Sequence, residues 1–278
     1  MTAIDGLTSP TLKHLREHWW DDEFTEFLAE TLKPRPGNRI LDVGCGEGLA
    51  EVSIGRLHIS QVRLVGVDRV VSKVLAARHE TASHNQRVGF AAGDACHLPF
   101  VDGAFDSLFC VAVLQHIRDV DSAVRECARV TAPGGRLVAV EPDNSARYAF
   151  SSAPSGREAF EASARFFAAL LCARGEQADP AIGPKLPELF ARHRIDPISV
   201  RLFPVSQARL GAPAPSTWVE RRWAVQRELD QSPTDDVRAL GEEYLSVLAR
   251  YESEAAAAGS AFVEIQNTML FATVGQRT

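Results

Sequence analysis

Nine residues near the start of the chain, Ile40 to Gly48, constrain its fold more than any other stretch. They read as an apolar strand that breaks into glycines at alternate positions, Gly44, Gly46 and Gly48, and then enters a helix near Leu49. Glycines so placed let the backbone turn sharply at the carboxyl end of a strand and approach a ligand without an intervening β-carbon. The stretch therefore predicts a nucleotide-type binding loop.

Two kinds of loop fit this pattern, and they differ in glycine spacing. A dinucleotide-binding loop has the spacing G-x-G-x-x-G, which lets a helix N-terminus receive a pyrophosphate. Here the third glycine comes one residue early, and Leu49 stands where that pattern has glycine. The spacing G-x-G-x-G behind a strand ending in Asp42 instead resembles motif I of the S-adenosylmethionine-dependent methyltransferases with a Rossmann-like fold, whose ligand has no phosphate. The rest of the chain decides between the two ligands.

Composition limits the kind of ligand. Of the 278 residues, 45% are hydrophobic and 24% are charged, and the formal net charge is −6. These values are typical of a globular protein, and a net negative charge argues against a surface for nucleic acid or anionic membrane. The sequence shows neither a secretion signal nor an apolar run of membrane-spanning length. We therefore expect a cytoplasmic protein that acts on a small molecule and binds neither nucleic acid nor membrane.

The cysteines indicate neither a disulfide framework nor a metal centre. Their number is odd, they are widely spaced, and no two of them form a C-x-x-C pair. We therefore expect reduced, mostly buried thiols and no metal site. The residues concerned are Cys45, Cys96, Cys110, Cys127 and Cys172.

Strands and helices alternate from residue 38 to residue 141, which indicates a parallel sheet with helices on both faces. In such sheets, ligands bind at the carboxyl ends of the strands. The strands are expected at residues 39–43, 62–67, 88–92, 105–111 and 136–140, and the intervening helices at residues 49–57, 72–84 and 121–130.

Acidic residues end four of these strands, so we expect four carboxyl groups at one edge of the sheet. Asp68, about two dozen residues beyond the glycines, suits the two hydroxyls of a ribose, and such charge-assisted hydrogen bonds contribute roughly 1.5 to 3 kcal/mol each. Asp94 suits the exocyclic amine of adenine, which is a donor-only group. For any one of them the alternative is a helix N-cap, which four successive strand ends disfavour. The four are Asp42, Asp68, Asp94 and Glu141.

Over about residues 36–143 the ordered motifs resemble the class I S-adenosylmethionine-dependent methyltransferases, in the style of the quinone-biosynthesis and natural-product enzymes. The resemblance implies an α/β fold with a mostly parallel seven-stranded sheet, helices on both faces and an antiparallel last strand. It also implies S-adenosyl-L-methionine as cofactor and a place in secondary metabolism. The motifs are Ile40–Gly48, Gly66–Asp68, Gly93–Ala95, Leu98–Phe100, Phe105–Asp106, Leu114–Ile117, Arg129–Val130 and Pro133–Leu137.

The resemblance also implies roles by position. Gly44, Gly46 and the neighbouring backbone would hold the methionine part of the cofactor. Asp68 would hold the ribose, and Asp94 with Ala95 the adenine. The whole implied set is Asp42, Gly44, Cys45, Gly46, Gly48, Asp68, Arg69, Asp94, Ala95 and, beside the sulfonium, Cys110 and Val111.

Methyl transfer needs an in-line nucleophile near a positively charged sulfur, with water largely excluded. In the family, the stretch after the fourth strand approaches the methyl group, which makes Gln115 and His116 substrate neighbours. A base is required only when the acceptor keeps its proton at neutral pH. Histidine has an ordinary pKa of about 6.5, so His116 is the candidate base. The alternative is a histidine that ties the loop to the backbone.

The C-terminal half adds helical insertions to this core. A capping box at Ser155–Glu158 predicts one extra helix, and further helical stretches lie between the last two strands, at residues 198–205 and 261–274. Such insertions can form a lid that sets substrate choice, or a contact in a homodimer. The expected segments are residues 1–37 (helices covering the cofactor site), 38–143 (Rossmann-like core), 144–183 (helical insertion), 184–208 (core helix and strand), 209–259 (helical cap) and 260–278 (last strand).

Several side chains are candidates for the acceptor site, and each has a structural alternative. Aromatic residues at helical spacing are also typical of a core. Residues 185–227 hold eight Lys or Arg against three acidic residues, whereas residues 228–254 hold two against eight. This asymmetry fits either complementary solvated helix faces or an acidic substrate group met by Arg209, Arg221 or Arg222. The candidates are Trp19, Gln115, Tyr148, Trp218 and Arg222.

The sequence therefore predicts a methyltransferase that acts on a small, partly apolar metabolite. One alternative is a nicotinamide-dependent oxidoreductase, which the glycine spacing disfavours. The other is a non-catalytic protein that binds S-adenosylmethionine, since methyl transfer can proceed without a catalytic side chain.

Overall fold

The computed structural model describes residues 20–55, 62–84, 88–173, 179–231 and 234–278. These residues form two compact units. The first, here called the sheet unit, contains the described parts of Glu17–Ser145 together with Asp179–Phe203 and Met269–Thr278. The second, here called the helical unit, contains the described parts of Ala146–Ala178 and Pro204–Thr268.

Parallel strands form the centre of the sheet. β1 (Arg39–Val43) lies between β2 (Arg63–Asp68) and β4 (Phe105–Val111), and β3 (Val88–Ala92) lies beyond β2. Each of these neighbouring pairs is parallel, so the carboxyl ends of the four strands lie at one edge. The alternation of strands and helices along this stretch therefore places the glycine loop and the acids after β2 and β3 at the same edge.

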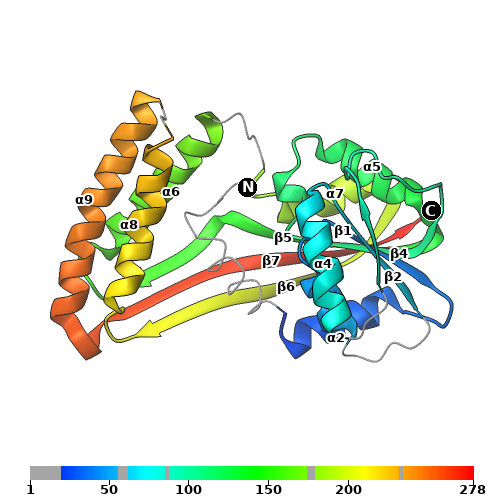
Figure 1. Cartoon of the computed structure of the whole chain (residues 1–278), viewed down its shortest axis with the longest axis horizontal. Helices are drawn as coiled ribbons and strands as arrows, with labels where there is room; N and C mark the ends of the chain where they lie inside the picture. Colours follow the sequence, from blue (N-terminus) through cyan, green and yellow to red (C-terminus); the bar gives the residue numbers. More distant parts are fainter. Residues whose placement is uncertain (1–19, 56–61, 85–87, 174–178, 232–233) are drawn as a thin grey trace. The chain divides into compact units, whose positions relative to one another are not determined.

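Three longer strands complete the sheet. In the described residues its order is β3-β2-β1-β4-β5-β7-β6. Figure 1 shows β5, β7 and β6 side by side. β5 is parallel to β4, whereas β7 is antiparallel to both of its neighbours. The seven-stranded, mostly parallel sheet with an antiparallel last strand is thus confirmed. The bounds of these strands are Thr131–Ser151 for β5, Ile195–Leu210 for β6 and Val263–Arg277 for β7.

Helices cover both faces of the sheet unit. Alternate residues of β1 serve the two faces, because side chains along a strand point in opposite directions. Leu41 and Val43 of β1 belong to the buried cluster on one face, which includes α5 and α7. On the other face, Ser107 of β4 donates from its hydroxyl to the carbonyl of Leu32 at the end of α2. The helices are α2 (Asp22–Leu32), α3 (Leu49–Gly55), α4 (Val71–Ser83), α5 (Val120–Val130) and α7 (Leu186–Arg192), with short 3₁₀ turns η1 (Leu114–His116) and η2 (Gly183–Lys185).

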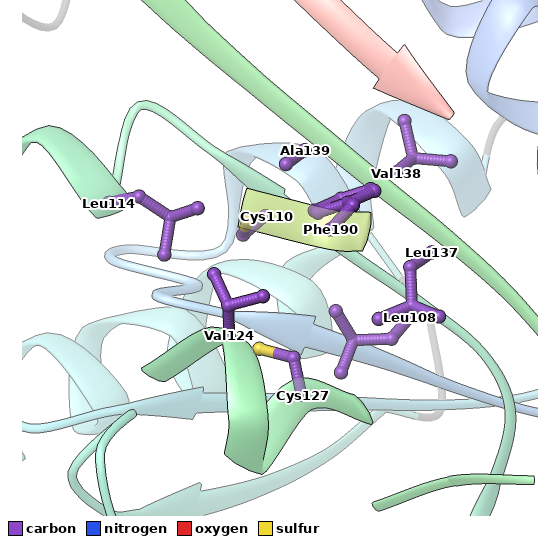
Figure 2. A pocket seen from close by; sticks show the side chains of 9 residues that line it. All are labelled: Leu108, Cys110, Leu114, Val124, Cys127, Leu137, Val138, Ala139 and Phe190. Atoms are coloured by element: carbon purple, nitrogen blue, oxygen red, sulfur yellow. The ribbon is translucent and has the colours of Figure 1, made fainter. Parts of the chain in front are cut away.

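The core of the sheet unit lies between β4, β5, α5 and α7. Figure 2 shows nine side chains around a small pocket there, and all of them are apolar or cysteine. A pocket without a polar lining group gives a polar cofactor nothing to bind, so this space belongs to the core. Its lining residues are Leu108, Cys110, Leu114, Val124, Cys127, Leu137, Val138, Ala139 and Phe190.

In the helical unit, α6 (Gly156–Ala173), α8 (Pro215–Leu229) and α9 (Asp235–Ala258) pack together, as Figure 1 shows. Tyr251 of α9 is 1% exposed and lies edge-on to Trp218, with 5.2 Å between ring centroids. Its hydroxyl donates to Glu264 at 2.7 Å. Burial opposes ionisation of Glu264, but hydrogen bonds from Arg221 and Tyr251 lower the pKa of that carboxyl.

The strands predicted at residues 39–43, 88–92 and 105–111 coincide with β1, β3 and β4. The predictions for β5 and β6 were too short, and the prediction for β7, residues 261–274, was offset by two to three residues. β5 was expected at residues 136–140, but it spans Thr131–Ser151, so the stretch after residue 143 begins as a strand rather than a helix. Hydrogen bonding to the neighbouring β7 keeps this stretch extended, although most of its side chains are exposed and give no buried-strand pattern.

The capping-box prediction located the start of α6 correctly but not its contacts. The Ser155 hydroxyl donates to Glu254 of α9 at 2.6 Å, and Glu158 accepts from Arg250 of the same helix at 2.7 Å. These two residues therefore join α6 to α9 within the helical unit.

Replacing Tyr251 by Phe should lower the free energy of unfolding by about 1 to 3 kcal/mol, because it removes a donor from a buried carboxylate. Urea denaturation followed by circular dichroism measures the change. Tyr148→Phe is the matched control, since the Tyr148 side chain is 59% exposed. Equal stabilities of wild type and Tyr251→Phe would contradict the prediction.

Candidate functional site

The loop between β1 and α3 owes its shape to three glycines with positive φ, at 81° for Gly44, 54° for Gly46 and 88° for Gly48. A β-carbon on Gly44 would lie 2.3 Å from Val113 Cγ2, and one on Gly48 would lie 3.1 Å from Ala77. A β-carbon on Gly46 would come no closer than 4.0 Å to the nearest of its neighbours, the Gly44 carbonyl. Packing thus requires two of the glycines, whereas Gly46 leaves an open surface on the loop.

Hydrogen bonds hold this loop to the end of β2. The backbone N–H groups of Gly44 and Cys45 both donate to the Val67 carbonyl, at 2.7 Å and 3.0 Å. Asp68 follows Val67, and its carboxylate accepts from the Gly46 N–H at 3.1 Å and from the Val70 N–H at 2.8 Å. Asp68 therefore joins the glycine loop to the turn that begins α4.

The end of β3 lies beside the end of β2. The Gly93 N–H donates to the Asp68 carbonyl at 3.1 Å, which fixes Asp94 close to Asp68 along the same edge. Asp94 is exposed, and its carboxylate accepts from the Cys96 N–H at 2.8 Å. Asp68 and Asp94 are thus two accessible acids on adjacent strand ends.

Arg129 of α5 supports the loop that follows Asp94. Its guanidinium donates to the carbonyls of Leu98 and Phe100, at 3.1 Å and 2.8 Å. Glu126 accepts from Arg129 and also from the Leu98 N–H at 2.9 Å. Hydrogen bonds with Arg129 lower the pKa of Glu126, although burial opposes this, so the pair keeps both charges and fixes the loop beside Asp94.

The other two acids expected at this edge are buried. Glu141 is 0% exposed, and its carboxylate accepts from the N–H groups of Val113, Leu114 and Gln115 at 2.8, 2.7 and 3.3 Å. Its position accounts for the shape of the stretch after β4, where Ala112 has a φ of 55°. Of the four acids expected at one edge of the sheet, Glu141 is thus buried, with its carboxylate held by backbone donors.

Asp42 is 3% exposed and lies near Glu51 of α3, which is 0% exposed. Burial raises the pKa of Asp42 well above its ordinary range, and the neighbouring charge of Glu51 raises it further. Burial also raises the pKa of Glu51, to about 7. Asp42 is thus buried beside a second carboxyl group and is not an accessible carboxylate like Asp68.

Gln115 and His116 lie together in η1. Gln115 is buried and accepts from the Asn144 side-chain amide at 3.0 Å, whereas His116 is half-buried. Cys110 contributes its side chain to the apolar pocket in Figure 2. Contact of Cys110 with a cofactor would therefore involve its backbone, as the half-buried Val111 beside it also could.

The remaining predicted residues lie next to the two acids in the sequence, in the helical unit, or outside the described residues. Trp19 lies outside the described residues. In the helical unit Trp218 is 2% exposed within the core, Tyr148 is exposed, and Arg222 pairs with Glu252. Arg69 is exposed and Ala95 half-buried in the sheet unit. Substrate contact by the helical-unit residues stays a prediction.

Other kinds of site find no support in the described ranges. Within them no cluster of three or more His, Cys, Asp or Glu side chains could hold a metal ion. None of the helices described there has the length and apolar character to cross a bilayer. The polar edge around Gly46, Asp68 and Asp94 is the candidate site because hydrogen bonds join the glycine loop and two accessible acids there.

Comparisons with known proteins point to the same segment. A family model described as a methyltransferase domain matches residues 41–139. The methyltransferase GfsG of Streptomyces halstedii is 37% identical over 116 residues, which are 42% of this chain and 42% of that protein. The 27-O-demethylrifamycin SV methyltransferase of Amycolatopsis mediterranei is 35% identical over 146 residues, which are 48% of this chain and 52% of that protein. The matches thus span about half or less of these curated relatives.

A solved structure has the same fold over most of its length. Geranyl diphosphate methyltransferase in complex with SAM has a TM-score of 0.53 to this chain and 15% sequence identity. The similarity covers 98% of this chain and 92% of that one. At this level of identity the likeness shows the fold alone.

Replacing Gly46 by Ala should lower the free energy of unfolding by about 1 to 2 kcal/mol, the cost of placing a β-carbon in left-handed backbone. Gly44→Ala should lower it by more, because the added carbon also meets Val113. Urea denaturation of both variants gives the comparison. An equal loss in the two variants would show that the contact with Val113 does not constrain the loop.

Proposed function

We propose that this chain, which carries a class I S-adenosylmethionine-dependent methyltransferase domain over residues 41–139, transfers a methyl group to a small, partly apolar metabolite. The observation that carries the proposal is the hydrogen bond from the Gly46 N–H to Asp68, which joins the glycine loop to an accessible acid at the end of the next strand. The name of the Amycolatopsis mediterranei relative identifies a small-molecule acceptor for that protein, which supports an acceptor of this class here.

The residues present fit the cofactor. Gly46 leaves an open surface beside the loop backbone, so the methionine part could approach there. The half-exposed Asp68 has acceptor oxygens for ribose hydroxyls, and the exposed Asp94 has an acceptor for the adenine amine. None of these contacts, at Gly46, Asp68 or Asp94, uses a phosphate-binding helix N-terminus, and this favours S-adenosylmethionine over a nicotinamide dinucleotide.

When bound, S-adenosylmethionine supplies an electrophilic methyl group on a positively charged sulfur. The chain's own task is then to hold the acceptor in line and to exclude water. Glu141 accepts from three backbone N–H groups at and just before η1, and these hydrogen bonds fix the backbone positions of Gln115 and His116. His116 is proposed to accept the proton of an acceptor that is protonated at neutral pH.

Titration calorimetry with S-adenosylhomocysteine and with NAD tests the choice of ligand. We expect S-adenosylhomocysteine to bind and NAD not to bind. Asp68→Asn should weaken S-adenosylhomocysteine binding about tenfold or more, because a carboxylate forms stronger hydrogen bonds to hydroxyls than an amide does. Binding of NAD alone would support the oxidoreductase and contradict the proposal.

His116→Ala should lower turnover by about 10²- to 10⁴-fold if His116 is the base, and should remove the acidic limb of the pH–rate profile. The measurement is transfer of a labelled methyl group to an acceptor identified in a cell extract, across a range of pH. His79→Ala is the control, since His79 is an exposed histidine of α4. Unchanged profiles in His116→Ala would leave positioning alone as the role of η1.

A further inference from the structure

Glu51 is a buried acid that the proposed chemistry does not use. It lies in the first turn of α3 and is 0% exposed, and neither of its carboxyl oxygens accepts from a donor group in the described part of the chain. A β-carbon on Gly66 would lie 2.5 Å from Glu51 Oε1, so the carboxyl group rests directly on β2 at this glycine. Gly66 is in register with Asp42 of β1. Glu51 thus packs against the paired residues Asp42 and Gly66, next to the glycine loop.

Among the described residues, the groups around Glu51 supply no positive charge to offset a second carboxylate. The titratable neighbours are Asp42 from β1, Asp68 from β2 and Cys45 from the loop, and the acids among them raise the pKa of groups in this cluster. The buried side chains that α2 and α4 contribute are uncharged: Phe24, Thr25, Phe27, Leu28 and Leu32 from α2, and Val74, Ala77 and Thr81 from α4. An isolated buried charge is costly, and groups in such positions retain or gain a proton instead.

We propose that Glu51 is a positioning residue that shares one proton with Asp42 and thereby holds the first turn of α3 against β1 and β2, at the base of the glycine loop. A protonated carboxyl group can donate a hydrogen bond to its neighbour, whereas two carboxylates can only repel each other. The shared proton gives each member of the pair a partner and leaves the pair with one negative charge. The inference rests on the proposed function in one respect, namely that this loop holds S-adenosylmethionine.

Sharing of this proton predicts how stability and cofactor affinity change with pH, and both changes can be measured. Burial raises the pKa of both carboxyl groups in the folded chain above their unfolded values. The folded state therefore binds more protons than the unfolded state, and stability falls as the pH rises from the ordinary carboxyl range through about 7. Loss of the shared proton, which rests on Asp42 once Glu51 has ionised, places two carboxylates next to the loop, so cofactor affinity falls as the pH rises through the raised pKa of Asp42.

Glu51→Gln tests the inference, because the amide can donate to Asp42 as the protonated acid does but cannot ionise. Glu80→Gln is the control and removes an exposed carboxyl group from α4. The first measurement is the melting temperature of the ligand-free chain between pH 5 and pH 9. The second is calorimetric titration with S-adenosylhomocysteine over the same range. If Glu51→Gln does not fold, Asp42→Asn serves for the first measurement, since the amide introduced there can donate to Glu51.

In wild type and in Glu80→Gln we expect the melting temperature to fall with rising pH, and the Kd for S-adenosylhomocysteine to increase about tenfold per pH unit once the shared proton is lost. In Glu51→Gln both dependences should be much reduced, with a Kd near neutral pH within about threefold of wild type. The same steep dependences in Glu51→Gln as in wild type would overturn the inference. If wild type binds no S-adenosylhomocysteine at any pH, the proposed function fails, whereas the melting temperatures still decide whether the proton is shared.

Discussion

The contact between Asp68 and the Gly46 N–H is the interaction on which the candidate site depends. It joins the loop after β1 to the end of β2 at 3.1 Å, and the second carboxylate oxygen holds the turn into α4. Because the two strands are parallel and in register, their carboxyl ends lie at one edge. A single acid can therefore accept hydrogen bonds from the segments that follow both strands. The Gly93 N–H extends the arrangement to β3 by donating to the Asp68 carbonyl.

Two buried carboxyl groups, Glu141 and Glu51, stabilise the backbone around this edge, and they do so through different partners. Glu141 is ionisable but has three backbone donors, so it fixes the stretch that contains Gln115 and His116. Glu51 has no such donors among the residues that the structure describes, which is why a proton shared with Asp42 accounts for its burial. The accessible acids Asp68 and Asp94 are thus distinct from the buried acids that shape their surroundings.

Local sequence patterns predicted the edge itself. The glycine spacing and the acids after β2 and β3 are encoded within single strand–loop units, so Asp68 and Asp94 could be placed from the sequence. Glu141 could not be placed in this way, because its donors lie 26 to 28 residues earlier in the chain. Glu51 gave little signal, since α3 has seven residues and the helix buries Ala50, Val52 and Ile54 beside it. The length of β5 depends on pairing with β7, which periodicity within β5 does not encode.

The most direct test of the proposed cofactor site is a crystal structure of the chain with S-adenosylhomocysteine. We expect the ribose hydroxyls on the Asp68 carboxylate, the adenine amine at Asp94 and the methionine part against the open surface at Gly46. A ligand bound elsewhere, with Asp68 still held only by its backbone donors, would contradict the assignment of this edge as the cofactor site.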